Sequence, residues 1–576
     1  MIGNIVKYSD FYRENPPKDY INLIKNIPKE ELLVTVNAIN SRLKPIMSLD
    51  FDDSREVQIN CLNTILLNNK QNLDVLRCSK NLINRFLDFP IMFSLFTRVT
   101  CLYAIQEILN YEGFNEGKID YTFEIRENIF KFLLIINENI LKYDEKYNVK
   151  ELEKEYNSFE FFMFKELPHN QYYNTINPIH LIDKSNFLFE KINSDVLYGE
   201  HLRKYLKDSY LCDEIGDLFH DVFSIYISSN DEVLGLTYIN IEPEKHPEVV
   251  KFLDKLSERI TFDKLSYNDP KIFEFLSIKK SPIYKCKSKN ENIVTYLILD
   301  SILFLEKLYS LFINDFWFDY LKPNKVCTRK DWGNFIGAYF YEPFLEMIFK
   351  NMFKYNKKTI FKHTDDLKIK LSKNEIEYAD FYIRNKNRVI LAEAKSNYLP
   401  VINGYKTVSN IEDFKKIDLN KFYKDYGLKQ LVEKTLKYFH DYKFLLNDDK
   451  QVLSKKIKLY PLLIVNDPII SSNYAINAFR NKFKELLKDN NIEINSEEHL
   501  IYPLAIINTS DLQKIEQSLK NRDENIFNLL RHYHSITNNS IKKNQDILMT
   551  FSNTSDRIIK NKLISKRIKL KNIFSI

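Results

Sequence analysis

The stretch IEYADFYIRNKNRVILAEAK, residues 376–395, decides the fold that we predict for the C-terminal part of this chain. Two largely apolar runs flank the polar turn RNKN, a pattern that predicts a β-hairpin. If the turn centres on Lys386 and Asn387, then Asp380 and Glu393 are equally far from it and lie directly opposite each other. Asn387 tolerates positive φ, which favours a tight turn at this point. The hairpin therefore predicts a close pair of carboxylates.

A lysine completes this constellation. Side chains alternate between the two faces of a strand, so Glu393 and Lys395 project from the same face of RVILAEAK. Two neighbouring carboxylates repel each other unless a cation lies between them, and hard divalent ions prefer carboxylate oxygens. Asp380 and Glu393 thus predict a site for Mg²⁺ or Mn²⁺. The alternative is a hairpin salt bridge between Lys395 and the acids, although burying three ionisable groups for structure alone usually costs more than it returns.

The elements around the hairpin predict a mixed sheet flanked by helices. Apolar periodicity indicates helices near 332–354 and at 428–442, 474–489 and 510–521, and strands at 359–363, 375–383, 388–396, 458–467 and 500–508. Upstream, the first part of the chain is helical in pattern. Two strand pairs are predicted there, one at 222–228 with 233–241 and one at 281–285 with 293–300, the second followed by a helix at 301–321.

The chain has 576 residues, and a single core rarely grows past ~250–300 residues. We predict a multidomain α+β protein in which a large, mainly α-helical N-terminal region precedes an α/β core with a mixed sheet. The predicted domains are a helical domain at 1–150, a mixed, mostly helical region with short strands at 151–325, the α/β domain at 326–515, and a helical basic extension at 516–576. The basic residues at its end can follow a phosphate backbone or form a solvated helix; they are Arg557, Lys560, Lys562, Lys566, Arg567, Lys569 and Lys571.

Glycine is scarce in this chain. There are 10 glycines, whereas average usage would give about 40. None is spaced as G-x-G and none precedes Lys-Ser or Lys-Thr, which excludes the phosphate-binding loops of Rossmann and P-loop proteins, and G-x-S-x-G hydrolases are excluded by the same test. Four glycines lie around the predicted carboxylate pair: Gly333, Gly337, Gly404 and Gly427. We therefore expect the loop at 396–427 to face a substrate.

Cysteine and hydropathy patterns predict a cytoplasmic protein without a membrane segment. The six cysteines form no C-x-x-C pair, and the N-terminal stretch has no apolar core of a signal peptide. The two most apolar stretches are predicted to be buried helices because both contain charges, Arg98 in one and Asp300, Glu306 and Lys307 in the other. The His-Asp dipeptides at His220 and His440 are close to the number expected by chance, so they predict no metal site.

Ala379-Asp380, the hairpin and Glu393-Ala394-Lys395 together resemble the PD-(D/E)XK motif of restriction-endonuclease-like nucleases, with Ala379 at the position of the family's proline. The resemblance covers roughly 330–510, where the order of helix, three strands, helix and strand is similar to that superfamily's core. It implies that Asp380, Glu393 and the Ala394 carbonyl bind Mg²⁺ or Mn²⁺. It further implies that Lys395 positions or deprotonates the attacking water and stabilises charge on the phosphate.

Two further positions follow from the resemblance. The first helix of such proteins often carries an extra acid that completes the metal shell through water, and Glu342 and Glu346 are the candidates here. Pro343 kinks or starts a helix next to Glu342, which leaves the choice between them open. Gln430 opens the helix after the loop and is either a contact to backbone phosphate or a surface amide.

The resemblance implies a metal-dependent hydrolase of phosphodiester bonds, in class EC 3.1. We expect a DNA endonuclease that acts on double-stranded DNA in bacterial restriction or antiphage defence. We also expect a protein partner or activating signal at the N-terminal region, and a homo-oligomer, because duplex cleavage needs two cuts. The alternative is a non-cleaving nucleic-acid-binding or protein-interaction scaffold with a nuclease-like fold. The intact Asp380, Glu393 and Lys395 argue against that alternative.

Overall fold

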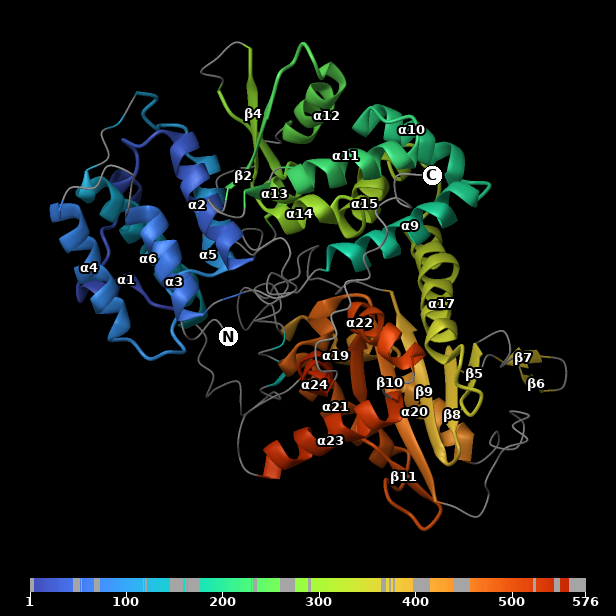
Figure 1. Ribbon diagram of the computed structural model, residues 1–576. Coiled ribbons are helices and arrows are strands. Elements are labelled where there is room, and N and C mark those ends of the chain that lie inside the picture. The colour runs from blue at the N-terminus through green and yellow to red at the C-terminus, as the bar shows by residue number, and fades with distance from the viewer. Residues whose placement is uncertain are drawn as a thin grey trace. The chain divides into compact units, whose positions relative to one another are not determined.

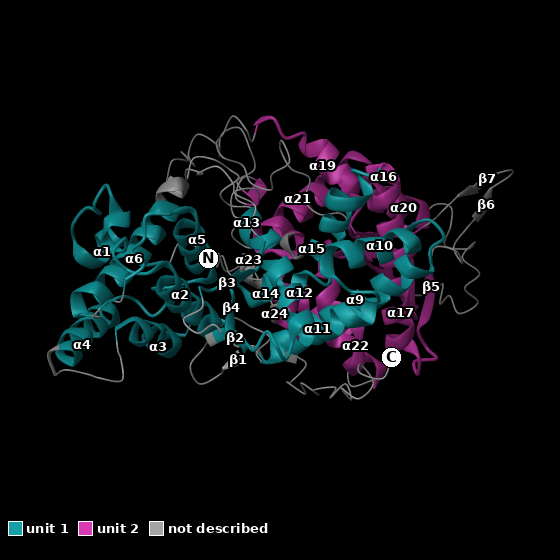
Figure 2. Ribbon diagram, turned by 90° about the horizontal axis from the view of Figure 1, so that it is seen from above, with its two compact units in different colours: residues 1–148, 172–324 teal, residues 149–171, 325–576 magenta. Residues whose placement is uncertain are grey.

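The computed structural model describes 20 segments of the chain, counting single residues as segments: residues 5–44, 52, 54–66, 73–117, 119, 122–145, 159–160, 163, 177–228, 230–231, 236–258, 275–287, 292–363, 369–371, 374–376, 379–396, 415–439, 456–521, 525–542 and 550–558. The chain divides into two compact units (Figure 2). Unit 1 comprises Met1–Asn148 and Tyr172–Asn324, and unit 2 comprises Val149–Gln171 and Lys325–Ile576.

Unit 1 is mainly helical and contains one small sheet (Figure 1). Its described helices are α1 (Tyr8–Tyr12), η2 (Tyr20–Leu23), α2 (Lys29–Leu43), α3 (Arg55–Leu66), α4 (Leu73–Leu87), α5 (Arg98–Asn110), α6 (Phe123–Glu145), α9 (Pro178–Ser194), α10 (Tyr198–Tyr210), α11 (Ile215–Ser228), α12 (Pro247–Ser257), α13 (Leu276–Lys280), α14 (Ser301–Glu306), α15 (Ser310–Asp315) and η4 (Phe316–Leu321). The sheet has the order β1-β2-β4-β3, with β1 (Asn230–Asp231), β2 (Leu236–Ile241), β3 (Ile283–Lys285) and β4 (Val294–Ile298), all antiparallel.

One of the two strand pairs predicted in this unit is confirmed and the other is wrong. The pair at 281–285 and 293–300 forms β3 and β4. The stretch at 222–228 belongs instead to helix α11, and β2 pairs with β4. In α11 the buried side chains recur at steps of three and four residues, from Leu218 through Val222 to Tyr226. That spacing selects a helix, whereas the sequence in isolation offers an apolar run that suits a strand equally well.

Two of the charges that interrupt the most apolar stretches, Arg98 and Asp300, are partners in the interior of unit 1. The Arg98 guanidinium donates to both carboxylate oxygens of Asp300, at 2.8 and 2.6 Å, and each residue is 2% exposed. Asn40 also donates to Asp300, which caps α14 by accepting from the Leu303 N–H. Burial acts to raise the pKa of Asp300, but Arg98 and the other donors outweigh it and hold that pKa below its ordinary value. Within the described residues, none of the helices has the length and apolar character needed to cross a membrane.

Unit 2 is built on a mixed sheet, as predicted, and this sheet has six strands. The strand order is β11-β10-β9-β8-β5, and β12 also pairs with β10. The strands are β5 (Ile360–His363), β8 (Phe381–Asn385), β9 (Arg388–Lys395), β10 (Ile457–Val465), β11 (His499–Ile501) and β12 (Ala505–Asn508). Strands β5, β8 and β9 are antiparallel, whereas β10 runs parallel to β9, β11 and β12. The central strands are buried along nearly their whole length, which explains their almost continuous apolar sequences.

Helices flank this sheet (Figure 1). They are α16 (Arg329–Asn334), η5 (Phe335–Tyr341), α17 (Glu342–Phe353), α19 (Leu419–Asp425), α20 (Leu428–Lys437), η8 (Pro468–Ser471), α21 (Asn473–Asp489), α22 (Thr509–Lys520), α23 (Ile526–Lys542) and α24 (Phe551–Ile558). Helix α20 packs on β9 and α21, and α17 packs on α22 and β5. The first of these contacts matters most for function, because it holds one face of α20 against the strand that carries Glu393 and Lys395.

Two predicted strands are broken in the structure. The stretch 375–383 does not form one strand: β7 (Asn374–Ile376) pairs with β6 (Ile369–Leu371) in a separate hairpin, and β8 begins only at Phe381. The stretch 500–508 forms β11 and β12, which are separated at Pro503. Proline has no N–H to donate to a ladder, so a strand that continued through it would lose a hydrogen bond.

The helical run predicted at 332–354 is present but changes its pitch at Glu342. Residues 335–341 are π-helical, and the Glu342 N–H donates to the carbonyl of Gly337, five residues back. Pro343 then lies in the first turn of α17, where a helix needs no N–H donor. Pro343 therefore starts α17, one of the two roles predicted for it.

We expect removal of either partner of the Arg98–Asp300 pair to destabilise the protein by about 3–5 kcal/mol, because it leaves a buried charge uncompensated. Arg98→Met and Asp300→Leu test this by urea denaturation, and the double variant should recover much of the loss. Lys204→Met is the control, since the Lys204–Glu200 pair is exposed and its removal should leave the urea midpoint close to that of wild type. Single variants as stable as wild type would contradict this role.

Candidate active site

The hairpin at 381–395 has the predicted register. Phe381 pairs with Ala392 and Asn385 with Arg388, so the turn is Lys386–Asn387. The positive φ falls on Lys386, at 57°, and not on Asn387 as expected. The reason lies in the contacts of Asn387, whose side chain donates to the Lys456 carbonyl and whose own carbonyl accepts from the Lys458 N–H. Asn387 thus ties the turn to the start of β10.

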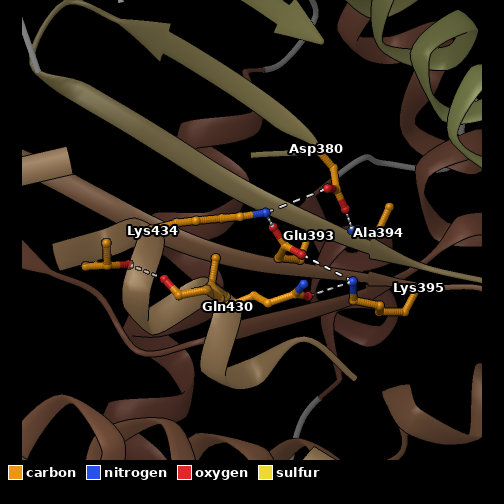
Figure 3. Close-up of polar contacts among 8 residues, drawn as sticks. Asp380, Glu393, Ala394, Lys395, Gln430 and Lys434 are labelled. Carbon is orange, nitrogen blue, oxygen red and sulfur yellow. Dashed lines mark hydrogen bonds and ion pairs between the residues drawn. The ribbon is translucent and has the colours of Figure 1, made fainter. Parts of the chain in front are cut away.

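The register brings Asp380 and Glu393, hereafter the acidic pair, to the same place (Figure 3). Asp380 directly precedes β8, and its Oδ2 accepts from the Ala394 N–H at 2.7 Å. Glu393 lies on β9, next to Leu463 of β10, and is 1% exposed. Burial raises the pKa of Glu393, and the charge of Asp380 raises it further. The site therefore holds a carboxylate whose charged form depends on nearby cations.

Lys395 is the first of these cations. Its Nζ donates to Glu393 Oε2 at 3.2 Å and to Gln430 Oε1 at 3.1 Å, and its side chain is 17% exposed. Gln430, in the first turn of α20, thus contacts the lysine in this structure, and its predicted contact with phosphate stays a prediction. The Lys395 ammonium is fixed on two sides and still reaches the surface.

Gly427 makes room for Lys395. It precedes α20 with φ at +74°, a conformation that favours glycine. A Cβ at this position would lie 2.4 Å from Cε of Lys395 and 3.2 Å from Oε1 of Gln430. The lysine stem therefore passes over the bare Cα of Gly427, which gives this glycine a structural role that its place in the sequence does not disclose.

Lys434 is a second cation in the site, and sequence reasoning missed it. Its Nζ makes a hydrogen-bonded ion pair with Glu393 Oε1 and lies 3.8 Å from Asp380 Oδ1 (Figure 3). Lys434 follows Gln430 by four residues, so both side chains project from the same face of α20. That spacing is the one available signal in the sequence, and it acquires meaning only once α20 is known to cover β9.

The acidic pair fits a divalent cation. Asp380 Oδ1 and Glu393 Oε1 converge on a single cationic atom, the Lys434 Nζ. Mg²⁺ is usually held by one or two carboxylates with waters and substrate phosphate completing its shell. In the part of the chain that the structure describes, no group of three or more His, Cys, Asp or Glu side chains is placed to hold a metal. Two carboxylates, with Ala394 as the predicted third ligand, are thus the donors that the site offers.

The structure places both candidates for the extra acid on α17. Glu342 begins that helix and is partly buried, and Glu346 forms an ion pair with Lys350 at 2.7 Å. The preceding π-helix η5 passes close to the end of β9, because a Cβ at Gly337 would lie 3.4 Å from Ser396 Oγ. The helix run that carries both acids therefore passes beside the residue that follows Lys395, and the role of Glu342 stays a prediction.

Other predicted positions are less informative. Gly404 and most of the 396–427 loop lie outside the described residues, as do the basic residues from Lys560 to Lys571 and His440. His220 and Asp221 contact each other at 3.2 Å on a partly exposed helix face.

The chain matches no family model, no curated protein and no solved structure.

We expect Gly427→Ala to disturb both the fold and the lysine. An alanine at positive φ costs about 1–2 kcal/mol, and its Cβ must push Lys395 away from Gln430. Urea denaturation should show the loss of stability, and a crystal structure of the variant should show Lys395 Nζ beyond hydrogen-bond distance of Gln430. Gly333→Ala is the matched control, because an added Cβ there meets no atom within 4 Å. Equal stability of the two variants, with Lys395 unmoved, would contradict the role of Gly427.

Proposed function

We propose that this protein is a Mg²⁺-dependent nuclease that hydrolyses phosphodiester bonds, with Asp380, Glu393 and Lys395 as its catalytic residues. The observation that carries the proposal is the convergence of two carboxylates and a lysine at the end of one buried hairpin. Buried ionisable groups seldom cluster for stability alone, because desolvation costs more than a structural ion pair returns. Clusters of this kind, with a raised carboxyl pKa, are typical of functional sites.

The topology supports a restriction-endonuclease-like core. Helix α17, strands β5, β8 and β9, helix α20 and strand β10 occur in the chain order that the resemblance to PD-(D/E)XK nucleases implies, with the β6–β7 hairpin between β5 and β8 and helix α19 before α20. Glu393 and Lys395 stand on β9 and Asp380 directly precedes β8, an arrangement that supports the resemblance. We propose that unit 2 contains this core, between residues 326 and 515.

The residues of the site have distinct tasks in this mechanism. Asp380 Oδ1 and Glu393 Oε1 would hold the metal, which when bound supplies a Lewis acid for the phosphate and a more acidic water. Lys395, held by Glu393 and Gln430, offers its ammonium at the surface, where it can position the attacking water and stabilise the charge that develops on phosphate oxygens. The water oxygen bonds to phosphorus as the bond from phosphorus to the leaving oxygen breaks, giving a phosphate monoester and a hydroxyl.

The substrate that we propose is double-stranded DNA, cut internally, and the setting is bacterial restriction or antiphage defence. Both follow from the resemblance to restriction-endonuclease-like nucleases. In this proposal unit 1 recognises a protein partner or an activating signal, and two copies of the chain act together on the two strands.

Plasmid cleavage tests the proposal. Wild-type protein with Mg²⁺ should nick supercoiled plasmid DNA, and EDTA should abolish the nicking. Lys395→Ala and Asp380→Asn should each lower the rate at least about 100-fold, because each removes a group that acts on the reacting atoms. Lys429→Ala should retain the wild-type rate, since Lys429 lies on the exposed side of α20 and pairs there with Glu433.

Two outcomes would contradict the proposal. Nicking that survives Lys395→Ala and EDTA would come from another site or from a contaminant. Binding of DNA by the wild type without nicking under any metal condition would favour the non-cleaving scaffold.

A further inference from the structure

The oxygens of the acidic pair divide into two sets. Asp380 Oδ2 accepts from the Ala394 N–H, and Glu393 Oε2 accepts from Lys395. These two bonds lie within the hairpin and fix how the carboxylates are turned. The other two oxygens, Asp380 Oδ1 and Glu393 Oε1, both face Lys434. A metal ion bound by both carboxylates through these two oxygens would occupy the place of the Lys434 ammonium.

Charge leads to the same conclusion. The acidic pair carries two negative charges, and Lys395 and Lys434 carry two positive ones, so the four side chains are balanced without a metal. A divalent ion added to this set leaves two positive charges in excess in a site where side chains are 1–17% exposed. Such an excess is unfavourable in a poorly solvated site unless an anion enters with the metal. The phosphates of a nucleic acid supply that anion.

We propose that Lys434 is an internal counter-ion that the catalytic metal must displace, and that the displaced ammonium then binds a phosphate of the nucleic acid. The inference rests on the proposed nuclease function and adds a regulatory feature to the same site. Metal and nucleic acid bind cooperatively, because each favours the state in which Lys434 has left the acidic pair. Without nucleic acid, Lys434 lowers the affinity of the site for the metal.

The position of Lys434 allows this movement. Its ammonium is carried on a flexible four-carbon stem from α20, and its side chain is 14% exposed, so part of that side chain already meets solvent. Lys395 differs in this respect, since its stem is confined by Gly427 and its ammonium is shared between Glu393 and Gln430. We therefore expect the Lys395 ammonium to remain beside the acidic pair when a metal binds, and the Lys434 ammonium to move away from it.

Metal affinity measured with and without DNA tests the inference in the full-length protein. The free Mn²⁺ concentration is followed by electron paramagnetic resonance, in the presence or absence of a DNA duplex whose phosphorothioate linkages slow hydrolysis. In the wild type the duplex should raise Mn²⁺ affinity by roughly 5–150-fold, the usual range of coupling between two ligands. Lys434→Met should bind Mn²⁺ at least about tenfold more tightly than wild type without DNA, and the duplex should add little.

Two further variants separate charge from structure. Lys434→Arg keeps the positive charge and should keep the low affinity of wild type without DNA. Lys429→Met removes a charge from the exposed side of the same helix and should also behave as wild type. Circular dichroism and thermal unfolding establish that each variant is folded before the titration.

The inference is overturned if folded Lys434→Met binds Mn²⁺ no more tightly than wild type, or if it gains affinity equally with and without the duplex. The plasmid assay then separates the nuclease function from the counter-ion role of Lys434. Mg²⁺-dependent nicking that needs Lys395 would leave the nuclease function standing without the counter-ion role. A wild-type protein that neither binds Mn²⁺ nor nicks DNA would contradict both the nuclease function and the counter-ion role of Lys434.

Discussion

The burial of the Glu393 carboxylate beside Asp380 is the constraint on which the site depends. Glu393 stands on a central strand of the unit 2 sheet, where it is 1% exposed, and burial together with Asp380 raises its pKa. A carboxylate there stays charged only if cations surround it. Two lysines meet that need, Lys395 from the same strand and Lys434 from α20. The same demand for cations underlies the proposal that the acidic pair binds a divalent ion.

The rest of unit 2 serves to hold these four side chains together. The turn at Lys386–Asn387 sets the hairpin register, and the Ala394 N–H orients Asp380. Helix α20 packs on β9 and supplies Gln430 and Lys434 from one face. Gly427, just before that helix, leaves room for the Lys395 side chain. In a chain with 10 glycines, this one is retained where a side chain would collide with the proposed catalytic lysine. A site built from strands, carboxylates and lysines needs glycine here for space and not to bind phosphate.

The parts of the site that could be predicted from sequence are those set by local geometry. A hairpin pairs residues by their distance from the turn, so the meeting of Asp380 and Glu393 follows from residues 376–395 alone. Lys434 and Gly427 could not be found in this way, because their roles depend on how α20 packs on β9. The apolar run at 222–228 suits a helix and a strand alike, and its packing within unit 1 is what places it in helix α11. The apolar pattern alone predicts one strand at 500–508 and one at 375–383. The structure divides the first at Pro503 and separates β7, in its hairpin with β6, from β8 in the second.

The central claim is that the acidic pair binds a divalent metal at the place where Lys434 now lies. Anomalous X-ray diffraction from crystals of the full-length protein soaked in Mn²⁺ and a DNA duplex tests it most directly. The account predicts an anomalous peak within coordination distance of both Asp380 Oδ1 and Glu393 Oε1, with Lys434 withdrawn from both and Lys395 still beside Gln430. Lys434 still paired with Glu393 at saturating Mn²⁺, and no peak between the two carboxylates, would contradict it.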